Sequence, residues 1–241
     1  MSKVTFRRPA HLEVLEMLSK LDNAFLARAQ CYFGGGTRIV LELGEYRESK
    51  DIDFLCSSRD GYRLLRETVS EQSLGPILTS GLSLAREVRA DQYGIRTFLE
   101  GNSIKLKFEI IREGRIDLDG GMVRKLPVAC LTRQHCFAEK FLANADRGLD
   151  ASTLSRDVVD LAFMLEGWSK EDAVAGMAIA KRAYGNSVER SLAEVIKKMQ
   201  EDKAYRNRCI DGLGVTDPKV LTAGLQALSH SDWSVPSTSN S

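Results

Sequence analysis

Two aspartates are the residues of this chain whose type and spacing most directly indicate chemistry. Asp51 and Asp53 stand two apart in the segment DIDFLC, and in a β-strand such residues project to the same face. Two carboxylates held side by side repel each other unless a cation lies between them. Mg²⁺ suits this position, because it takes one or two carboxylates and completes its shell with water and phosphate oxygens. The pair therefore predicts a magnesium site.

A run of glycines precedes this pair, from Gly34 to Gly36, and Thr37 follows it. Glycine lets backbone amides approach a phosphate closely, and a helix beginning at Thr37 adds its positive N-terminal end and a hydroxyl. The run is not a Walker loop or a dinucleotide fingerprint, because GK[ST] and the GxGxxG spacing are absent. Alone, a glycine run is usually a turn and an acidic pair a solvated strand face. In succession they favour triphosphate binding beside a metal.

These residues need strands and helices to position them. Short apolar runs predict strands at 31–33 and 51–56, and Thr37 and Gly44 are expected to start and stop a helix over 37–43. Apolar residues at helical spacing predict one or two helices within 9–30 and another over 61–74. Alternating apolar residues then predict strands within 83–90, 95–101 and 103–111, with a turn at Gly101 and Asn102.

From Leu131 onward the sequence predicts helices alone, within the segments 131–148, 155–168, 171–185, 187–212 and 218–230. The fold class is therefore α/β in the front half and all-helical in the back half. We expect an α/β domain over 1–126, a helical domain over 127–233 and a disordered tail over 234–241, which is polar and rich in serine.

At this point the sequence resembles the polymerase-β-like nucleotidyltransferases, whose signature is a Gly-Ser or Gly-Gly turn followed by Asp-x-Asp. It is more similar still to the AbiEii/AbiGii-type toxin branch, in which GGT precedes R-x-S-x-D-x-D. Gly35 to Thr37 and the segment from Arg47 to Asp53 reproduce that pattern. The segments SIKLKFEII, FAEKFLANADRG and SRDVVDLAFML resemble the family's later motifs in order. The resemblance implies a mixed-sheet nucleotidyltransferase domain followed by a helical region.

Polymerase-like transfer generally uses a third carboxylate on a neighbouring strand, which holds metal and takes the proton of the attacking hydroxyl. Glu109 is the candidate for this role. It shares a strand face with Lys105 and Lys107, so a structural ion pair with a lysine is an equal alternative.

The resemblance also implies that Lys140 contacts the nucleotide phosphates; the alternative is a surface lysine paired with Glu139 or Asp146. Asp157 and Asp160 lie three apart on the flank of an apolar helix stripe, where a carboxylate needs a cationic partner. Lys140 is one candidate partner and Arg156 is another.

Arg47 and Ser49 are predicted to position phosphate or to brace the Asp51–Asp53 strand, although a turn hydrogen bond is the plainer interpretation of Ser49. His135 and Cys136 near Cys130 do not supply four well-spaced zinc ligands. The basic run from Lys181 to Arg208 could bind an RNA backbone, but the acids that interrupt it favour a solvated helix face.

Composition places limits on location and partners. The net charge of +1 is not typical of a nucleic-acid-binding protein, so RNA would have to be bound by a local basic patch. Five scattered cysteines without a CxxC pair suit reduced thiols, and the charged N-terminal segment is typical of neither a signal peptide nor a membrane span. We expect a cytoplasmic protein with no membrane association.

The expected activity is transfer of NMP from an NTP to an acceptor hydroxyl. Asp51, Asp53 and Glu109 would hold two Mg²⁺ ions, and Gly35, Gly36, Thr37 and Lys140 would hold the NTP, with Arg47, Ser49, Asp157 and Asp160 in support. The resemblance further implies a toxin acting on tRNA 3′ ends, with an antitoxin as its protein partner. A small-molecule nucleotidyltransferase and a non-catalytic binding protein of the same fold are the alternatives.

Overall fold

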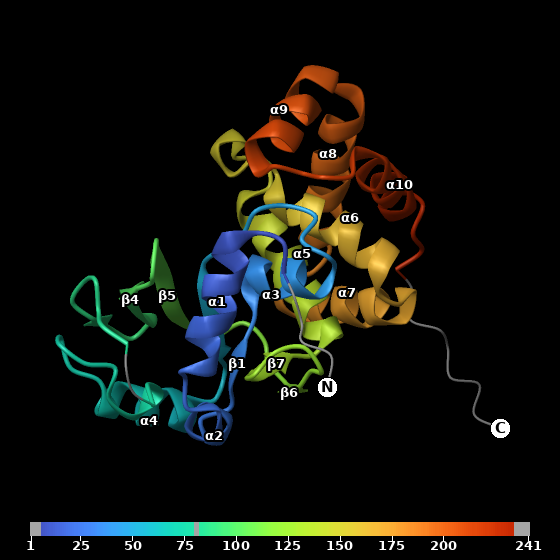
Figure 1. Ribbon diagram of the computed structural model, residues 1–241. Coiled ribbons are helices and arrows are strands. Elements are labelled where there is room, and N and C mark those ends of the chain that lie inside the picture. The colour runs from blue at the N-terminus through green and yellow to red at the C-terminus, as the bar shows by residue number, and fades with distance from the viewer. Residues whose placement is uncertain (1–5, 80–81, 234–241) are drawn as a thin grey trace. The chain divides into compact units, whose positions relative to one another are not determined.

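The computed structural model of the chain describes residues 6–79 and 82–233 (Figure 1). The expected tail over 234–241 lies outside the described residues. The chain divides into two compact units: the first contains the described residues of 1–45 and 49–132, and the second contains 46–48 and the described residues from 133 onward. The division after Thr132 falls later than the expected boundary at residue 126. The short segment Tyr46–Glu48 belongs to the helical unit.

The first unit is built on a mixed sheet of seven strands in the order β3-β4-β5-β2-β1-β7-β6. β2 pairs with β1 in antiparallel and with β5 in parallel, so β2 lies in the interior of the sheet. The strands are β1 (Cys31–Phe33), β2 (Ile52–Cys56), β3 (Arg89–Ala90), β4 (Gly94–Glu100), β5 (Lys105–Arg112), β6 (Gly120–Met122) and β7 (Ala129–Leu131). The predicted α/β class with a mixed sheet is confirmed.

Alternation along β2 separates an apolar face from a polar one. Ile52 and Phe54 are fully buried in one apolar cluster with Phe108 of β5. Besides Leu41, the same cluster takes in apolar side chains of three helices, which therefore cover this face of the sheet. These helices are α1 (Pro9–Ser19), α2 (Asn23–Arg28) and α4 (Arg59–Thr68). Because neighbours in a strand point to opposite faces, Asp53 and Glu109 project from the other face.

Several predicted boundaries are wrong. The helix after the glycines, α3 (Gly35–Glu42), begins two residues early and has Gly34 as its N-cap, so Thr37 lies inside it and does not cap it. α4 ends at Thr68, and the strand predicted within 83–90 is reduced to β3. A 3₁₀ turn lies at Gly75–Ile77, and β6 and β7 were not predicted. The turn after β4 is confirmed, since the Gly101 amide donates to the Ile104 carbonyl at 2.9 Å.

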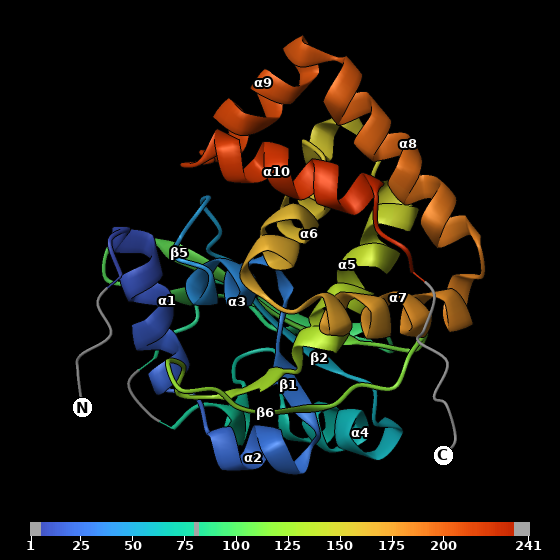
Figure 2. The ribbon, with the colours of Figure 1, turned by 90° about the vertical axis from the view of Figure 1, so that its right-hand side faces the viewer.

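The second unit is helical, as predicted. Its elements are α5 (Arg133–Arg147), a 3₁₀ turn at Ala151–Thr153, α6 (Arg156–Gly167), α7 (Lys170–Tyr184), α8 (Ser187–Glu201), α9 (Lys203–Leu213) and α10 (Pro218–Ser229). The stretch 187–212 forms two helices because Asp202 leaves the helical conformation and accepts a hydrogen bond from the Tyr205 amide, which caps α9. Figure 2 shows α10 lying across α6. A glycine in α10, Gly224, brings the two backbones close, since a Cβ there would lie 2.4 Å from the Ala162 carbonyl oxygen.

No helix within the described residues is long and apolar enough to cross a membrane. All five cysteines are buried as free thiols, which agrees with the expectation from their spacing.

A substitution at Gly61 tests how closely α4 packs against the backbone at Ala29. A Cβ at Gly61 would lie 1.9 Å from the Ala29 carbonyl oxygen, and backbone cannot move aside cheaply. We expect Gly61→Ala to lower the free energy of unfolding in urea by about 3 kcal/mol, the upper part of the usual range for overpacking. Gly114→Ala is the matched control, because no atom lies within 4 Å of its Cβ position, and it should change stability by less than about 0.5 kcal/mol. Equal effects would contradict the close packing.

Candidate active site

The glycine turn and Asp53 lie in direct contact. The Gly34 amide donates a hydrogen bond to the Asp53 carbonyl at 2.8 Å, which fixes the turn to the start of β2. Gly35 has φ +66°, and a Cβ at this residue would lie 2.5 Å from Oδ2 of Asp53. Only glycine satisfies both the backbone conformation and the space. The turn therefore brings the Gly35 backbone against the Asp53 carboxylate, in a place where a side chain would collide with it.

Thr37 and Ser49 brace the same turn. Thr37 is fully buried in the first turn of α3, and its Oγ1 lies 2.9 Å from Oγ of Ser49, so the two hydroxyls share a hydrogen bond. Ser49 stands just before the aspartate pair. This contact ties the start of the helix to the segment that leads into β2, which matches the bracing role predicted for Ser49.

Glu109 lies beside Asp53 but its carboxylate is held by cations. The two residues are register partners in the parallel pair of β2 and β5. Oε1 of Glu109 accepts from Nε of Arg96 at 2.6 Å, and Oε2 accepts from Nζ of Lys107 at 2.5 Å. The structural ion pair foreseen for this glutamate is thus present, with Lys107 as the lysine and Arg96 as a second partner.

The charges of these groups follow from their neighbours. Burial by itself would raise the pKa of Glu109, but the hydrogen bonds and charges of Lys107 and Arg96 outweigh burial and lower it. Burial likewise opposes the charge of Lys107, yet Glu109, Asp53 and Asp51 raise its pKa. Lys107 is therefore an ammonium close enough to both aspartates to feel their charge.

The carboxylates of this face fit a metal as a pair and not as a triad. Within residues 6–79 and 82–233, no three His, Cys, Asp or Glu side chains cluster closely enough to hold a metal ion. Glu109 is already engaged by two cations, and the His135–Cys136 segment forms no such cluster either. Asp51 and Asp53 are both half-buried, so neither carboxylate is closed off from solvent. Two such carboxylates suit Mg²⁺, which takes one or two of them and completes its shell with water and phosphate oxygens.

The other predicted site residues lie in the helical unit, where Asp160 is the centre of a buried ion cluster. Asp160 is fully buried. It accepts two hydrogen bonds from the guanidinium of Arg47, at 2.6 and 2.7 Å, and one from the Tyr46 hydroxyl at 2.6 Å. Nζ of Lys140 lies 2.6 Å from its Oδ2. Arg47 is thus a partner of Asp160 and does not brace the Asp51–Asp53 strand.

Asp157 completes this cluster. Its carboxylate accepts from Nζ of Lys140 at 2.9 Å and from two nitrogens of Arg147 at 2.8 and 3.1 Å. Lys140 thus bridges both aspartates, which is one of the two predicted pairings. The second cation of Asp157 is Arg147, whereas the sequence suggested Arg156. The ammonium has three donors, and the aspartates take two of them.

Burial makes this cluster sensitive to the loss of any member. Burial would raise the pKa of Asp160, but Arg47 and Lys140 outweigh it and hold the pKa below its usual range. The pKa of Asp157 is held down in the same way by Lys140 and Arg147. Burial would lower the pKa of Lys140, and the two aspartates raise it instead. All three groups are therefore charged near neutral pH.

Arg96, Arg147 and Tyr46 were not among the predicted site residues. Arg147 could have been found, because it lies seven residues after Lys140 on α5 and so on the same helix face. Tyr46 carries no local signal; its ring stacks on Phe163 at 4.0 Å between centroids, a contact made only in the folded chain.

The contact between Gly35 and Asp53 can be tested by adding one methyl group. Gly35→Ala is expected to displace the Asp53 carboxylate and to abolish metal binding by the pair. Gly44→Ala is the matched control, because Gly44 also has positive φ, at +82°, but has no atom within 4 Å of its Cβ position. Both variants carry the backbone strain of about 1 kcal/mol or more. Mn²⁺ affinity, measured by titration, should fall in Gly35→Ala alone; an equal loss in both would contradict the contact.

Lys140 should stabilise the helical unit. Lys140→Met leaves Asp157 with Arg147 alone and takes one cation from Asp160. We therefore expect the free energy of unfolding in urea to fall by about 3 kcal/mol, the lower end of what breaking a buried ion pair costs. Lys197→Met, at an exposed position of α8, should change it by less than about 0.5 kcal/mol. If the two variants are equally stable, the cluster does not hold the unit together.

Comparison with known proteins agrees with this geometry. No curated protein and no solved structure gives a significant match. The profile of one protein family, described as "Nucleotidyl transferase AbiEii toxin, Type IV TA system", matches residues 18–227. The match spans the glycine turn, the aspartate pair and the buried ion cluster. The chain therefore belongs to the AbiEii family of nucleotidyl transferase toxins from type IV toxin–antitoxin systems.

Proposed function

We propose that this protein transfers an NMP unit from an NTP to the 3′-hydroxyl of an RNA acceptor, with tRNA as the acceptor, in a Mg²⁺-dependent reaction. The observation that carries the proposal is the Gly35 backbone lying against the Asp53 carboxylate. This contact supports the proposal, because nucleotidyl transfer needs a phosphate-binding turn beside a metal-binding carboxylate.

The sheet unit would supply metal and phosphate binding. Asp51 and Asp53 would hold Mg²⁺, and the amides at the start of α3, from Gly35 to Thr37, would accept a phosphate, since the first N–H groups of a helix have no partner within it. When bound, Mg²⁺ would neutralise charge on the phosphates as the bond to the leaving group breaks. Lys107, held in place by Glu109, adds a fixed positive charge near both aspartates.

The reaction itself needs few further groups. The acceptor oxygen attacks the α-phosphorus, the bond to the β-phosphate oxygen breaks, and pyrophosphate leaves with the electron pair. The hydroxyl proton passes to water, because two cations lower the pKa of Glu109 and make it a weaker base, and Asp51 and Asp53 would be engaged with Mg²⁺. Lys140 is held by Asp157 and Asp160 in the helical unit, and its contact with nucleotide phosphates stays a prediction.

Family membership implies an antitoxin as the partner that restrains this activity. Because tRNA is the proposed acceptor, we place the reaction in the cytoplasm.

Transfer is tested by incubating the protein with each labelled NTP, Mg²⁺ and total RNA. We expect label on RNA in the tRNA size range, none after chelation of the metal, and a loss of at least about a hundredfold in Asp53→Asn, since metal stabilisation is worth several kcal/mol and each ~1.4 kcal/mol is tenfold in rate. Asp119→Asn, an exposed aspartate of the same unit, should retain full activity. Label on a small molecule would favour a small-molecule transferase. No label on any acceptor would favour a non-catalytic binding protein.

A further inference from the structure

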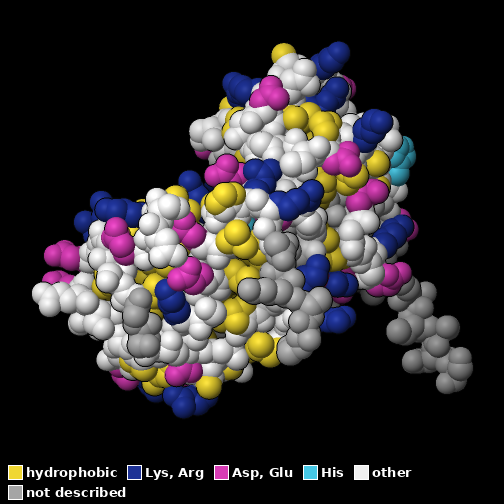
Figure 3. All heavy atoms as spheres, in the orientation of Figure 1, with side chains coloured by type: hydrophobic (Ala, Val, Ile, Leu, Met, Phe, Trp, Pro, Cys, Tyr) yellow, Lys and Arg dark blue, Asp and Glu magenta, His cyan; other side chains and the backbone are white. Residues whose placement is uncertain are grey.

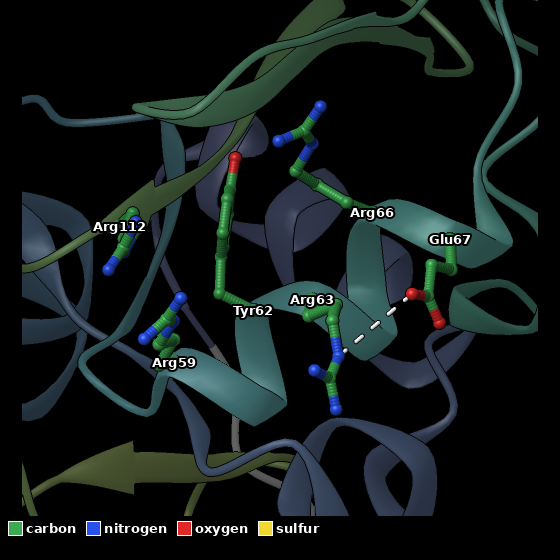
Figure 4. A pocket seen from close by; sticks show the side chains of 6 residues that line it. All are labelled: Arg59, Tyr62, Arg63, Arg66, Glu67 and Arg112. Carbon is green, nitrogen blue, oxygen red and sulfur yellow. Dashed lines mark ion pairs between the residues drawn. The ribbon is translucent and has the colours of Figure 1, made fainter.

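A cavity lined by arginines lies in the sheet unit and is used by none of the groups described above. Its volume is about 400 Å³, and it is lined by Arg59, Tyr62, Arg63, Arg66, Glu67 and Arg112. We refer to these six residues as the arginine pocket. Figure 4 shows Arg59 and Arg112 on one side of the Tyr62 ring and Arg66 on the other.

Helical spacing assembles this pocket. Arg59, Arg63 and Arg66 lie four and seven residues apart on α4 and therefore share one face of the helix. Arg112 is the last residue of β5, and its guanidinium carbon lies 6.0 Å from the centre of the Tyr62 ring. Tyr62 is itself fixed, because it is 3% exposed and its hydroxyl donates to the Asp91 carbonyl at 2.7 Å. The ring forms a rigid wall between the arginines.

The pocket carries more positive charge than its own acids balance. Glu67 lies 3.9 Å from Arg63, which also pairs with Asp60 at 3.3 Å. Within the part of the chain that the structure describes, Arg59, Arg66 and Arg112 have no carboxylate within ion-pair distance. Guanidinium groups stay protonated at all ordinary pH values. Gathering three of them around one hollow is unfavourable unless an anion is present.

The chemistry of the lining indicates phosphate on a polymer. Guanidinium forks match phosphate oxygens in pairs. The one aromatic ring is buried, so it offers no open face for a base to stack on. A second hollow of about 500 Å³ shares Arg66 and adds Arg89, with Glu71 as the acid in its lining. The two hollows together place cations along a path, which suits successive phosphates better than a single ion.

The arginine pocket is distinct from the aspartate pair. Arg112 follows Glu109 by three residues along β5, which corresponds to about 10 Å, and an odd spacing places the two side chains on opposite faces of the strand. A group bound in the pocket is thus separated from the groups proposed to react.

We propose that the arginine pocket binds the phosphodiester backbone of the RNA acceptor at a position remote from its 3′ end. The RNA as ligand rests on the proposed function; the anion-binding character of the pocket does not. Such a local patch meets the requirement set by a net charge of +1. It is also consistent with the face drawn in Figure 3, where Lys and Arg side chains are interspersed with Asp and Glu.

Direct RNA binding at several salt concentrations tests this proposal. Fluorescence anisotropy with labelled tRNA, in EDTA to prevent transfer, compares the wild type with Arg59→Gln/Arg66→Gln. We expect affinity to fall about tenfold or more, and the slope of log K against log salt to become shallower by about 1.4 to 1.8, since each lost phosphate contact removes about 0.7 to 0.9. The control, Arg124→Gln/Lys125→Gln, removes the same charge from exposed positions of the same unit.

The outcomes separate this proposal from the proposed function. If RNA affinity falls and the salt slope becomes shallower in the pocket variant alone, the pocket binds RNA, even if the wild type transfers no nucleotide. Equal loss in both double variants, or none in either, overturns it. Competition by millimolar NTP or inorganic phosphate gives a further outcome. If either displaces labelled tRNA from the wild type by more than the added salt explains, and does not do so from the control variant, the pocket would be assigned to free phosphates. Stronger binding of poly-L-glutamate than of RNA of equal charge would also overturn it.

Discussion

The close approach of the Gly35 backbone to the Asp53 side chain is the constraint on which the site depends. It requires a residue without a side chain, a positive φ and a strand that begins directly beneath the turn. The hydrogen bond from the Gly34 amide to the Asp53 carbonyl and the Thr37–Ser49 contact then hold the turn on the strand. The apolar side chains that alternate with Asp53 anchor the strand in the core, so the carboxylate occupies a fixed place on the opposite face of the sheet.

The helical unit handles charge in a different way. Around Asp53 the carboxylates are half-buried, whereas Asp157 and Asp160 are buried among cations that the chain itself supplies. Losing one partner there would leave a buried charge without compensation, which is costly. This explains why Arg47, two residues from Ser49, serves the helical unit although it lies within the same sequence motif.

Local signals predicted much of this arrangement, and tertiary contacts account for the rest. The alternation of apolar and polar side chains around Ile52 and Phe54 is sufficient to predict β2. The spacing of Asp51, Asp53 and the glycines is sufficient to select them as candidates for metal and phosphate binding. The start of α3 was misplaced because glycine favours a turn, and only the fold shows that Gly35 is helical. The Arg96–Glu109 pair could have been deduced from the strand register. The turn after Glu100 sets Glu100 opposite Lys105, and four residues back along β4 and four forward along β5 Arg96 then faces Glu109. β6 and β7 are three residues each, too short for an alternating pattern, and Tyr46 meets Asp160 only through folding.

We propose that the aspartate pair beside the glycine turn is the metal site on which nucleotidyl transfer depends. Electron paramagnetic resonance of Mn²⁺, titrated into the wild type and into Asp51→Asn/Asp53→Asn with a non-hydrolysable NTP analogue present, measures this most directly. We expect bound Mn²⁺ in the wild type and, in the variant, only the amount that the analogue binds by itself. Equal amounts of protein-bound Mn²⁺ in both proteins would contradict it.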